Sequence, residues 1–170
     1  IKKVFNSTFL SEGKLVKDFE DSLSSDLGIK NPVAVNSGTS ALHLSLILAN
    51  VRAGDEVILP AQTFITTGSS ILQQKAIPVF ADIDYKTGNI DVNDIKKKIS
   101  SKTKAIIAVH WGGYPCDMDE ISEIGKENKI AIIEDAAHAL GASYRKRPVG
   151  AISDFTCFSF QAIKHITTGD

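Results

Sequence analysis

The chain has 170 residues, and 43% of them are hydrophobic, which is enough for one continuous core in one globular body. Its net charge of −1 excludes a broad positive surface for nucleic acid or an anionic membrane. Cys116 and Cys157 lie far apart without metal-ligand spacing, which argues against a zinc site or a disulfide framework and favours a reducing cytoplasm. The apolar stretches are shorter than the ~20 residues of a membrane-spanning helix, and no secretory signal is visible in the first residues.

The first 30 residues predict an extended arm followed by a helix over about residues 14–27. Leu15, Val16, Phe19 and Leu23 recur there at helical spacing, and Gly28 is a suitable C-cap. From residue 33 onward, short β-branched runs alternate with helical patterns, as in α/β proteins. Strands are expected at residues 33–35, 56–59, 77–80, 105–109 and 130–133, and helices at residues 40–49, 63–74, 91–100 and 119–128.

The predicted strands are continuously apolar, so helices should cover both faces of the sheet. After Asp135 the regular alternation of strand and helix patterns stops, and residues 141–144 and 154–160 are expected to form strands without full helices between them. We therefore expect an α/β three-layer sandwich with a mostly parallel sheet. The arm and first helix occupy residues 1–30, and the main domain occupies residues 31–170.

Lys164 is the only Asp, Glu, Lys or Arg between Phe155 and Gly169. Desolvation disfavours the ammonium form of a lysine, and a neutral lysine amine is a nucleophile that can form an imine with an aldehyde. The alternative is a lysine at a strand end whose ammonium group reaches solvent. Lys164 is therefore a candidate nucleophile.

Asp135 follows Glu134 at the end of the apolar run 130–133, so two carboxylates end a predicted central strand. Ligands of open α/β sheets bind beyond that edge. A carboxylate there can pair with a protonated pyridine nitrogen and keep the ring able to accept electrons. The alternative is that one acid caps the next turn while the other faces solvent.

The segment Asn36-Ser37-Gly38-Thr39-Ser40 lies between a predicted strand and a helix. Helix N-termini present unpaired N–H groups and a positive dipole end, and Gly38 permits close approach to the backbone, so the segment is a candidate phosphate cradle. A strand-to-helix turn with a Ser/Thr cap has the same composition. The segment is neither a G-x-G-x-x-G sequence nor a P-loop.

Three further side chains lie near predicted strand ends. Phe64 would stack on a planar ring, although such a residue also serves in a core. His138 would lie on the same side as Asp135 if a helical turn follows, or else has a structural role. Ser159, placed in a predicted apolar strand, suits a phosphate oxygen or a backbone partner. Together these groups are the parts that a pyridoxal-phosphate (PLP) site requires.

The sequence resembles the DegT/DnrJ/StrS group of sugar aminotransferases, which have the fold type I, aspartate aminotransferase-like PLP architecture. The I-E-D-A-A-H-A run from Ile133 and S-F-Q-A-I-K from Ser159 are the most specific matches. Other matches are F-L-S-E-G-K from Phe9, N-S-G-T-S-A-L-H-L from Asn36, G-D-E-V-I-L-P from Gly54 and the Thr63-Phe64 pair.

The resemblance implies a role for each matching residue. Gly38, Thr39 and Ser159 would hold the phosphate, and Phe64 would stack on the ring. Asp135 would pair with the pyridine nitrogen, and Lys164 would hold PLP as a Schiff base. His138 takes the place near the phenolic oxygen, whereas Gln161 stands where relatives often have His or Tyr.

The resemblance also implies a reaction: transfer of an amino group, with glutamate as donor, to a nucleotide-linked keto-deoxysugar for polysaccharide or antibiotic sugar biosynthesis. The family's sites lie at a homodimer interface, and its chains continue beyond the lysine, so these residues are expected to be the incomplete N-terminal part of the large domain, inactive alone. A PLP sugar dehydratase, with histidine at the position of Lys164, and a non-catalytic regulatory or structural remnant are the alternatives. An NAD-dependent oxidoreductase is disfavoured because the glycine fingerprint is absent.

Overall fold

Five parallel strands form the central sheet of the computed structural model, which describes residues 2–7, 9 and 12–169. Their order across the sheet is β2-β1-β3-β4-β7. The chain passes from β1 to β2 on one side of the sheet and from β3 to β4 on the other, so the strand order reverses between β1 and β3. Ligands of such open sheets bind beyond the carboxyl ends of the strands near that point. The strands are β1 Glu56–Pro60, β2 Ile77–Ala81, β3 Thr103–Val109, β4 Ala131–Asp135 and β7 Phe155–Cys157.

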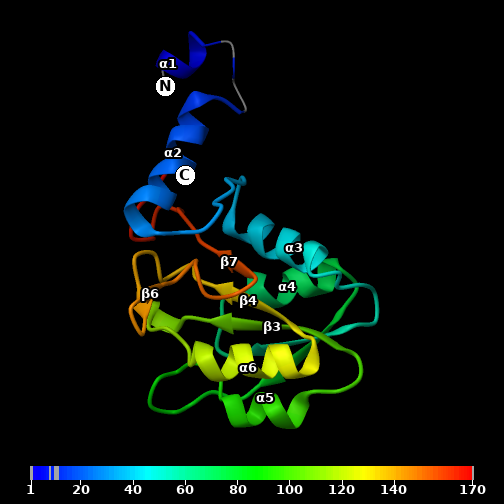
Figure 1. Cartoon of the computed structure of the whole chain (residues 1–170). Helices are drawn as coiled ribbons and strands as arrows, with labels where there is room; N and C mark the ends of the chain where they lie inside the picture. The colour runs from blue at the N-terminus through cyan, green and yellow to red at the C-terminus, as the bar shows by residue number, and fades with distance from the viewer. Residues whose placement is uncertain (1, 8, 10–11, 170) are drawn as a thin grey trace.

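Helices cover both faces of the sheet (Figure 1). The helices α3 Gly38–Leu48 and α4 Ile65–Gln73 lie on one face, and α5 Val92–Lys98 and α6 Met118–Asn128 lie on the other. Side chains alternate along each strand, so Ile107 packs in the core beneath α3 and α4, whereas Ile106 packs in the core above α5 and α6. The predicted three-layer α/β architecture is confirmed. No helix of the described residues is long and apolar enough to cross a membrane.

The N-terminal part consists of α1 Lys2–Phe5 and α2 Lys14–Leu27. The predicted bounds of α2 are confirmed, and Gly28 ends it in the left-handed conformation, with φ of 67° and its N–H donating to Ser24 O. The wholly extended arm was a wrong expectation, because Asn6 N donates to Lys2 O and closes a helical turn. Leu10 and Ser11 of the matching motif lie outside the described residues, as do residues 1, 8 and 170.

Two strand predictions need correction. Residues 33–35 are not a strand, since Ala34 N donates to Glu20 Oε1 of α2 at 2.8 Å and no strand of the described residues pairs with them. The expected strand over residues 154–160 is shorter, because among the described strands β7 pairs with β4 alone and that ladder ends at the Asp135–Cys157 pair. Ser159 therefore lies in a loop beyond β7. The expected strand near residue 144 exists as β5 Ser143–Tyr144, paired with β6 Arg147–Pro148.

Candidate active site

Asp135 is the last residue of β4, and its side chain lies on the face covered by α4, with the residue only 6% exposed. Thr67 Oγ1, from α4, donates a 2.8 Å hydrogen bond to Asp135 Oδ2, and Ala137 N donates to Oδ1 at 3.3 Å. Since the Thr67 hydroxyl has one hydrogen, it accepts from Thr63 Oγ1, 2.7 Å away. Two hydroxyl groups in series therefore orient the carboxylate at the carboxyl edge of the sheet.

His138 lies close enough to Asp135 and Lys164 for both charges to affect its titration. Burial and the positive charges of Lys164 and His165 lower the pKa of His138, and the Asp135 carboxylate partly opposes them. The turn that carries His138 is closed by Ala139 N, which donates to Ala136 O at 2.9 Å. Asp135 and Lys164, which the sequence singled out together with His138, thus both lie within electrostatic range of its imidazole.

Lys164 is half-buried in the loop that follows β7, and not at a strand end. Its backbone N–H donates to Gln161 O at 2.8 Å, so residues 161–164 form a turn that includes the exposed Gln161. The turn holds the lysine backbone in a defined conformation.

Gly38 begins α3 and faces the segment that follows β7. A Cβ atom added to Gly38 would lie 3.3 Å from both Phe158 O and Ser159 Cβ, closer than most Cβ contacts. The absence of a side chain therefore allows the α3 N-terminus and Ser159 to approach each other. Ser37 caps the helix, since its Oγ accepts from Ser40 N at 3.1 Å. Two segments far apart in sequence thus meet where a phosphate cradle is predicted.

Phe64 and Thr39 lie at the N-terminal ends of α4 and α3. Phe64 is the N-cap residue of α4, 70% exposed, three residues before Thr67. Thr39 is half-buried in the first turn of α3. Within the part of the chain that the structure describes, Phe64 is exposed and does not pack in the core, which was its alternative role.

Sequence reasoning missed Thr67 and Trp111. Thr67 donates the hydrogen bond to Asp135. The sequence could have indicated it, because Thr67 follows Thr63 by four residues at the start of a helix, and this spacing places two side chains on the same face. Trp111 begins the short 3-10 helix η1 Trp111–Gly113 after β3, with its ring centroid 6.1 Å from that of His138. A large aromatic side chain directly after a strand end was the available signal.

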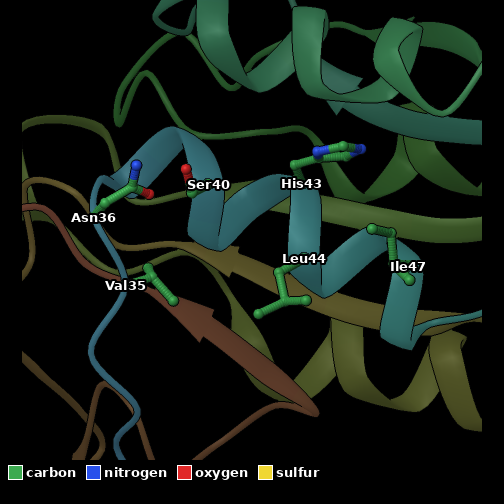
Figure 2. A pocket seen from close by; sticks show the side chains of 6 residues that line it. All are labelled: Val35, Asn36, Ser40, His43, Leu44 and Ile47. Atoms are coloured by element: carbon green, nitrogen blue, oxygen red, sulfur yellow. The ribbon is translucent and has the colours of Figure 1, made fainter. Parts of the chain in front are cut away.

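A separate groove runs along α3 (Figure 2). Its lining is mostly apolar, and only Asn36 and Ser40 of its residues belong to the predicted phosphate cradle. Asp135, His138 and Lys164 are not among the described residues that line it, so we do not place the cofactor ring there. The lining residues are Val35, Asn36, Ser40, His43, Leu44 and Ile47.

Residues 1–170 match the model of the DegT/DnrJ/EryC1/StrS aminotransferase family. GDP-perosamine synthase of Escherichia coli O157:H7 is 39% identical over 171 residues, which cover 100% of this chain and 47% of that protein. UDP-4-amino-4-deoxy-L-arabinose–oxoglutarate aminotransferase of Shewanella sediminis is 38% identical over 171 residues, which cover 100% of this chain and 44% of that protein. The chain thus spans about half the length of these curated relatives.

A putative sugar aminotransferase of Streptococcus pneumoniae has the same fold. Its structure in a PMP form superposes with a TM-score of 0.92 at 36% sequence identity, covering 97% of this chain and 46% of that one. The structure of its PLP form superposes equally well, with a TM-score of 0.92.

Proposed function

Because the chain belongs to the DegT/DnrJ/EryC1/StrS aminotransferase family, we propose that it forms the cofactor-binding part of a PLP-dependent aminotransferase acting on a nucleotide-linked keto-deoxysugar. The observation that carries this proposal is the grouping of Asp135, His138 and Lys164 at the carboxyl edge of a parallel sheet. An acceptor for a ring N–H and a lysine amine are the two groups that PLP chemistry needs from the protein.

The residues present fit the cofactor. Gly38 leaves space between the α3 N-terminus and Ser159, where a Cβ atom would make a 3.3 Å contact. The first N–H groups of a helix lack intrahelical acceptors and favour a phosphate dianion. In this proposal Gly38, Thr39 and Ser159 hold the phosphate, Phe64 packs against the ring, and His138 lies beside the ring substituents.

PLP, when bound, supplies an electron sink for a carbanion at the substrate carbon. Asp135 would accept a hydrogen bond from the ring nitrogen and keep it protonated, and Thr67 holds the carboxylate in position. Lys164 would hold the cofactor through Nζ, and the same Nζ atom would move a proton at the substrate carbon. Asp135 and Lys164 are therefore the proposed catalytic residues.

The substrate class rests on the relatives. One relative is named for a GDP-linked product, and another for a UDP-linked amino-deoxy sugar and oxoglutarate. Oxoglutarate is the keto acid that glutamate becomes when it donates its amino group. A nucleotide-linked keto sugar as acceptor and glutamate as donor are therefore the substrates we propose. Function as a homodimer and a cytoplasmic location remain predictions.

Of the alternatives, the PLP sugar dehydratase is disfavoured by Lys164, since the resemblance places histidine at that position in the dehydratase branch. The full-length protein loaded with PLP tests the choice. Addition of glutamate should convert the cofactor spectrum to that of the amine form, and a panel of nucleotide-linked keto sugars should then restore it. A spectrum that no amino acid changes would exclude an aminotransferase, and failure to bind PLP would favour the non-catalytic remnant.

A further inference from the structure

Glu134, the neighbour of Asp135 on β4, is a buried carboxylate with a complete set of partners. Both Glu134 and His110 have side chains that are 0% exposed, and His110 Nε2 lies 2.7 Å from Glu134 Oε2. Ser153 Oγ and Thr156 Oγ1 donate to Glu134 Oε1 at 2.6 and 2.9 Å. These four residues form what we call the Glu134 network.

The proton positions in the network follow from one backbone contact. Cys116 N donates to His110 Nδ1 at 3.1 Å, so Nδ1 is an acceptor and the ring hydrogen lies on Nε2. Nε2–H then donates to Glu134, which leaves His110 neutral and Glu134 ionised. Burial opposes this ionisation, whereas the hydrogen bonds from His110, Ser153 and Thr156 favour it. Glu134 is a fixed buried anion.

The network is joined to Asp135 through the backbone. Successive strand residues point to opposite faces, so Glu134 lies on the α5/α6 side and Asp135 on the α3/α4 side. The His110 ring binds Glu134, while its backbone N–H donates to Asp135 O at 3.1 Å. In the ladder between β4 and β7, Thr156 pairs with Glu134 and Cys157 with Asp135. One carboxylate therefore connects the ends of β3, β4 and β7 directly beneath Asp135.

A role in stability alone is a weak account of this arrangement. Replacing a buried ionic group by apolar side chains of similar volume is often neutral or stabilising. Here the charge lies at the strand ends beside the proposed catalytic carboxylate, whereas the strand interiors are filled by Ile106, Ile107 and Ile133.

We propose that Glu134 and His110 are positioning residues that hold the Asp135 backbone, and with it the Asp135 carboxylate, at the place where the cofactor's ring nitrogen binds. This inference deepens the proposed function and rests on it. Neither residue touches the reacting atoms. Their effect is on where Asp135 lies, and a displacement of ~1 Å in a catalytic group can cost about a hundredfold in rate.

The test compares two substitutions of His110 in the full-length protein. His110→Asn keeps an acceptor for Cys116 N but is too short to reach Glu134. His110→Gln extends an N–H donor toward Glu134. We expect His110→Asn to lower kcat with glutamate by about tenfold with little change in KM, and His110→Gln to keep kcat within about threefold of wild type. Equal kcat values for the two variants would overturn the proposal.

Amide hydrogen exchange of the cofactor-free protein is measured alongside the kinetics. In cofactor-free protein, the residue 110 amide hydrogen, which bonds to Asp135 O, should exchange about tenfold faster in His110→Asn than in His110→Gln. Unchanged exchange in His110→Asn would contradict the link to Asp135. If the wild-type protein neither binds PLP nor reacts with glutamate, the proposed function is wrong. If the wild-type protein is active but the two His110 variants have equal kcat values, only the positioning role is wrong.

Glu134→Gln gives a second route, with a matched control. An amide accepts on one oxygen only, so either His110 or the hydroxyl pair loses its acceptor, and kcat should fall by about tenfold. Glu56→Gln changes a carboxylate that accepts from Ser100 Oγ at 2.5 Å, at the opposite end of the sheet. Glu56→Gln should keep wild-type kcat, and equal losses in both variants would show a general effect on folding and overturn the proposal.

Discussion

Thr67 Oγ1 donates a 2.8 Å hydrogen bond to Asp135 Oδ2, linking the first turns of α4 to the end of β4 across 68 positions of sequence. Thr67 is fully buried and accepts in turn from Thr63. The side chain of Asp135 is therefore oriented from α4, while its backbone O accepts from the N–H of His110, directly after β3.

Thr67→Val should weaken both folding and catalysis, because valine has nearly the shape of threonine but cannot donate. We expect a loss of about 1 kcal/mol of folding free energy, the usual net value of one hydrogen bond. Turnover should fall further than that loss accounts for, since Asp135 Oδ2 is left without its donor. Urea unfolding and kcat with glutamate measure the two effects. Thr66→Val on the same turn is the control, and a kcat for Thr67→Val equal to that of the control would remove Thr67 from the site.

Asp135→Asn should preserve PLP binding but remove most turnover, since an amide does not keep a proton on the ring nitrogen. If Asp135 only caps the turn through Ala137 N, the substitution costs about 1 kcal/mol of stability and leaves the chemistry unchanged. The ratio of kcat to the amount of bound cofactor separates the two. Near-normal turnover in the loaded variant would contradict the proposed role.

The sequence was sufficient to predict the layers and the strand ends, because continuous apolar runs such as residues 105–109 leave little choice of burial. It was insufficient at residues 33–35, which have a strand-like composition but form a loop whose Ala34 N–H donates to Glu20. A strand needs a ladder partner, and composition does not reveal whether one is present.

The sequence singled out Lys164 and Asp135 because each of these residue types suggested one chemistry, and their roles remain predictions. The partners of these residues were not predictable, because Thr67 and His110 reach the site through contacts between elements distant in sequence. For Glu134 the sequence indicated no role of its own beyond that of a second acid at the strand end, where the alternative was a cap or a solvent-facing side chain, yet Glu134 is buried. The buried carboxylate of Glu134 needs hydrogen-bond donors, and these come from His110 after β3 and Thr156 of β7.

Gly38→Ala should weaken PLP binding more than it weakens folding. The new Cβ atom would lie 3.3 Å from Phe158 O and Ser159 Cβ, so the segment carrying Ser159 must move away from the α3 N-terminus. We expect the Kd for PLP to rise by about tenfold, the equivalent of about 1.4 kcal/mol. Titration of cofactor-free protein with PLP measures this change.

Gly68→Ala is the matched control for that experiment. Gly68 also lies in a helix, but its added Cβ would meet only Leu59 Cδ1 at 3.8 Å, an ordinary contact. Alanine favours helix over glycine by about 1 kcal/mol, so this variant should be at least as stable as wild type and bind PLP normally. A normal Kd for Gly38→Ala would argue against a cradle at the α3 N-terminus.

Lys164 should be the lysine that holds the cofactor. Borohydride reduction of the PLP-loaded protein, followed by peptide mapping, should place the label on the peptide containing Lys164. Lys164→Ala should lose both the label and turnover, whereas Lys146→Ala, at an exposed turn, should keep both. Label on another lysine would make the assignment wrong.

The titration of His138 reports on its neighbours without any cofactor. Burial and the charge of Lys164 lower the pKa of His138, whereas the Asp135 charge raises it. Because protonation is disfavoured in the folded state, the unfolded chain binds more protons at this site between the two pKa values. The stabilising contribution is fully present above the ordinary pKa of 6.5 and is lost as pH falls through the lower folded value. His138→Gln should reduce this loss of stability on acidification, as measured by urea unfolding at pH 7.5 and at about pH 5.

The two charged neighbours should shift this titration in opposite directions, which tests the proximity of all three residues. In cofactor-free protein, Lys164→Ala removes a positive charge and should raise the pKa of His138. Asp135→Asn removes a negative charge and should lower the pKa of His138 further. Titration of the imidazole resonances by NMR measures both, with Lys146→Ala as a control that should leave the titration unchanged. Shifts of the same sign in both variants, or no shift in either, would mean that Asp135, His138 and Lys164 do not share one site.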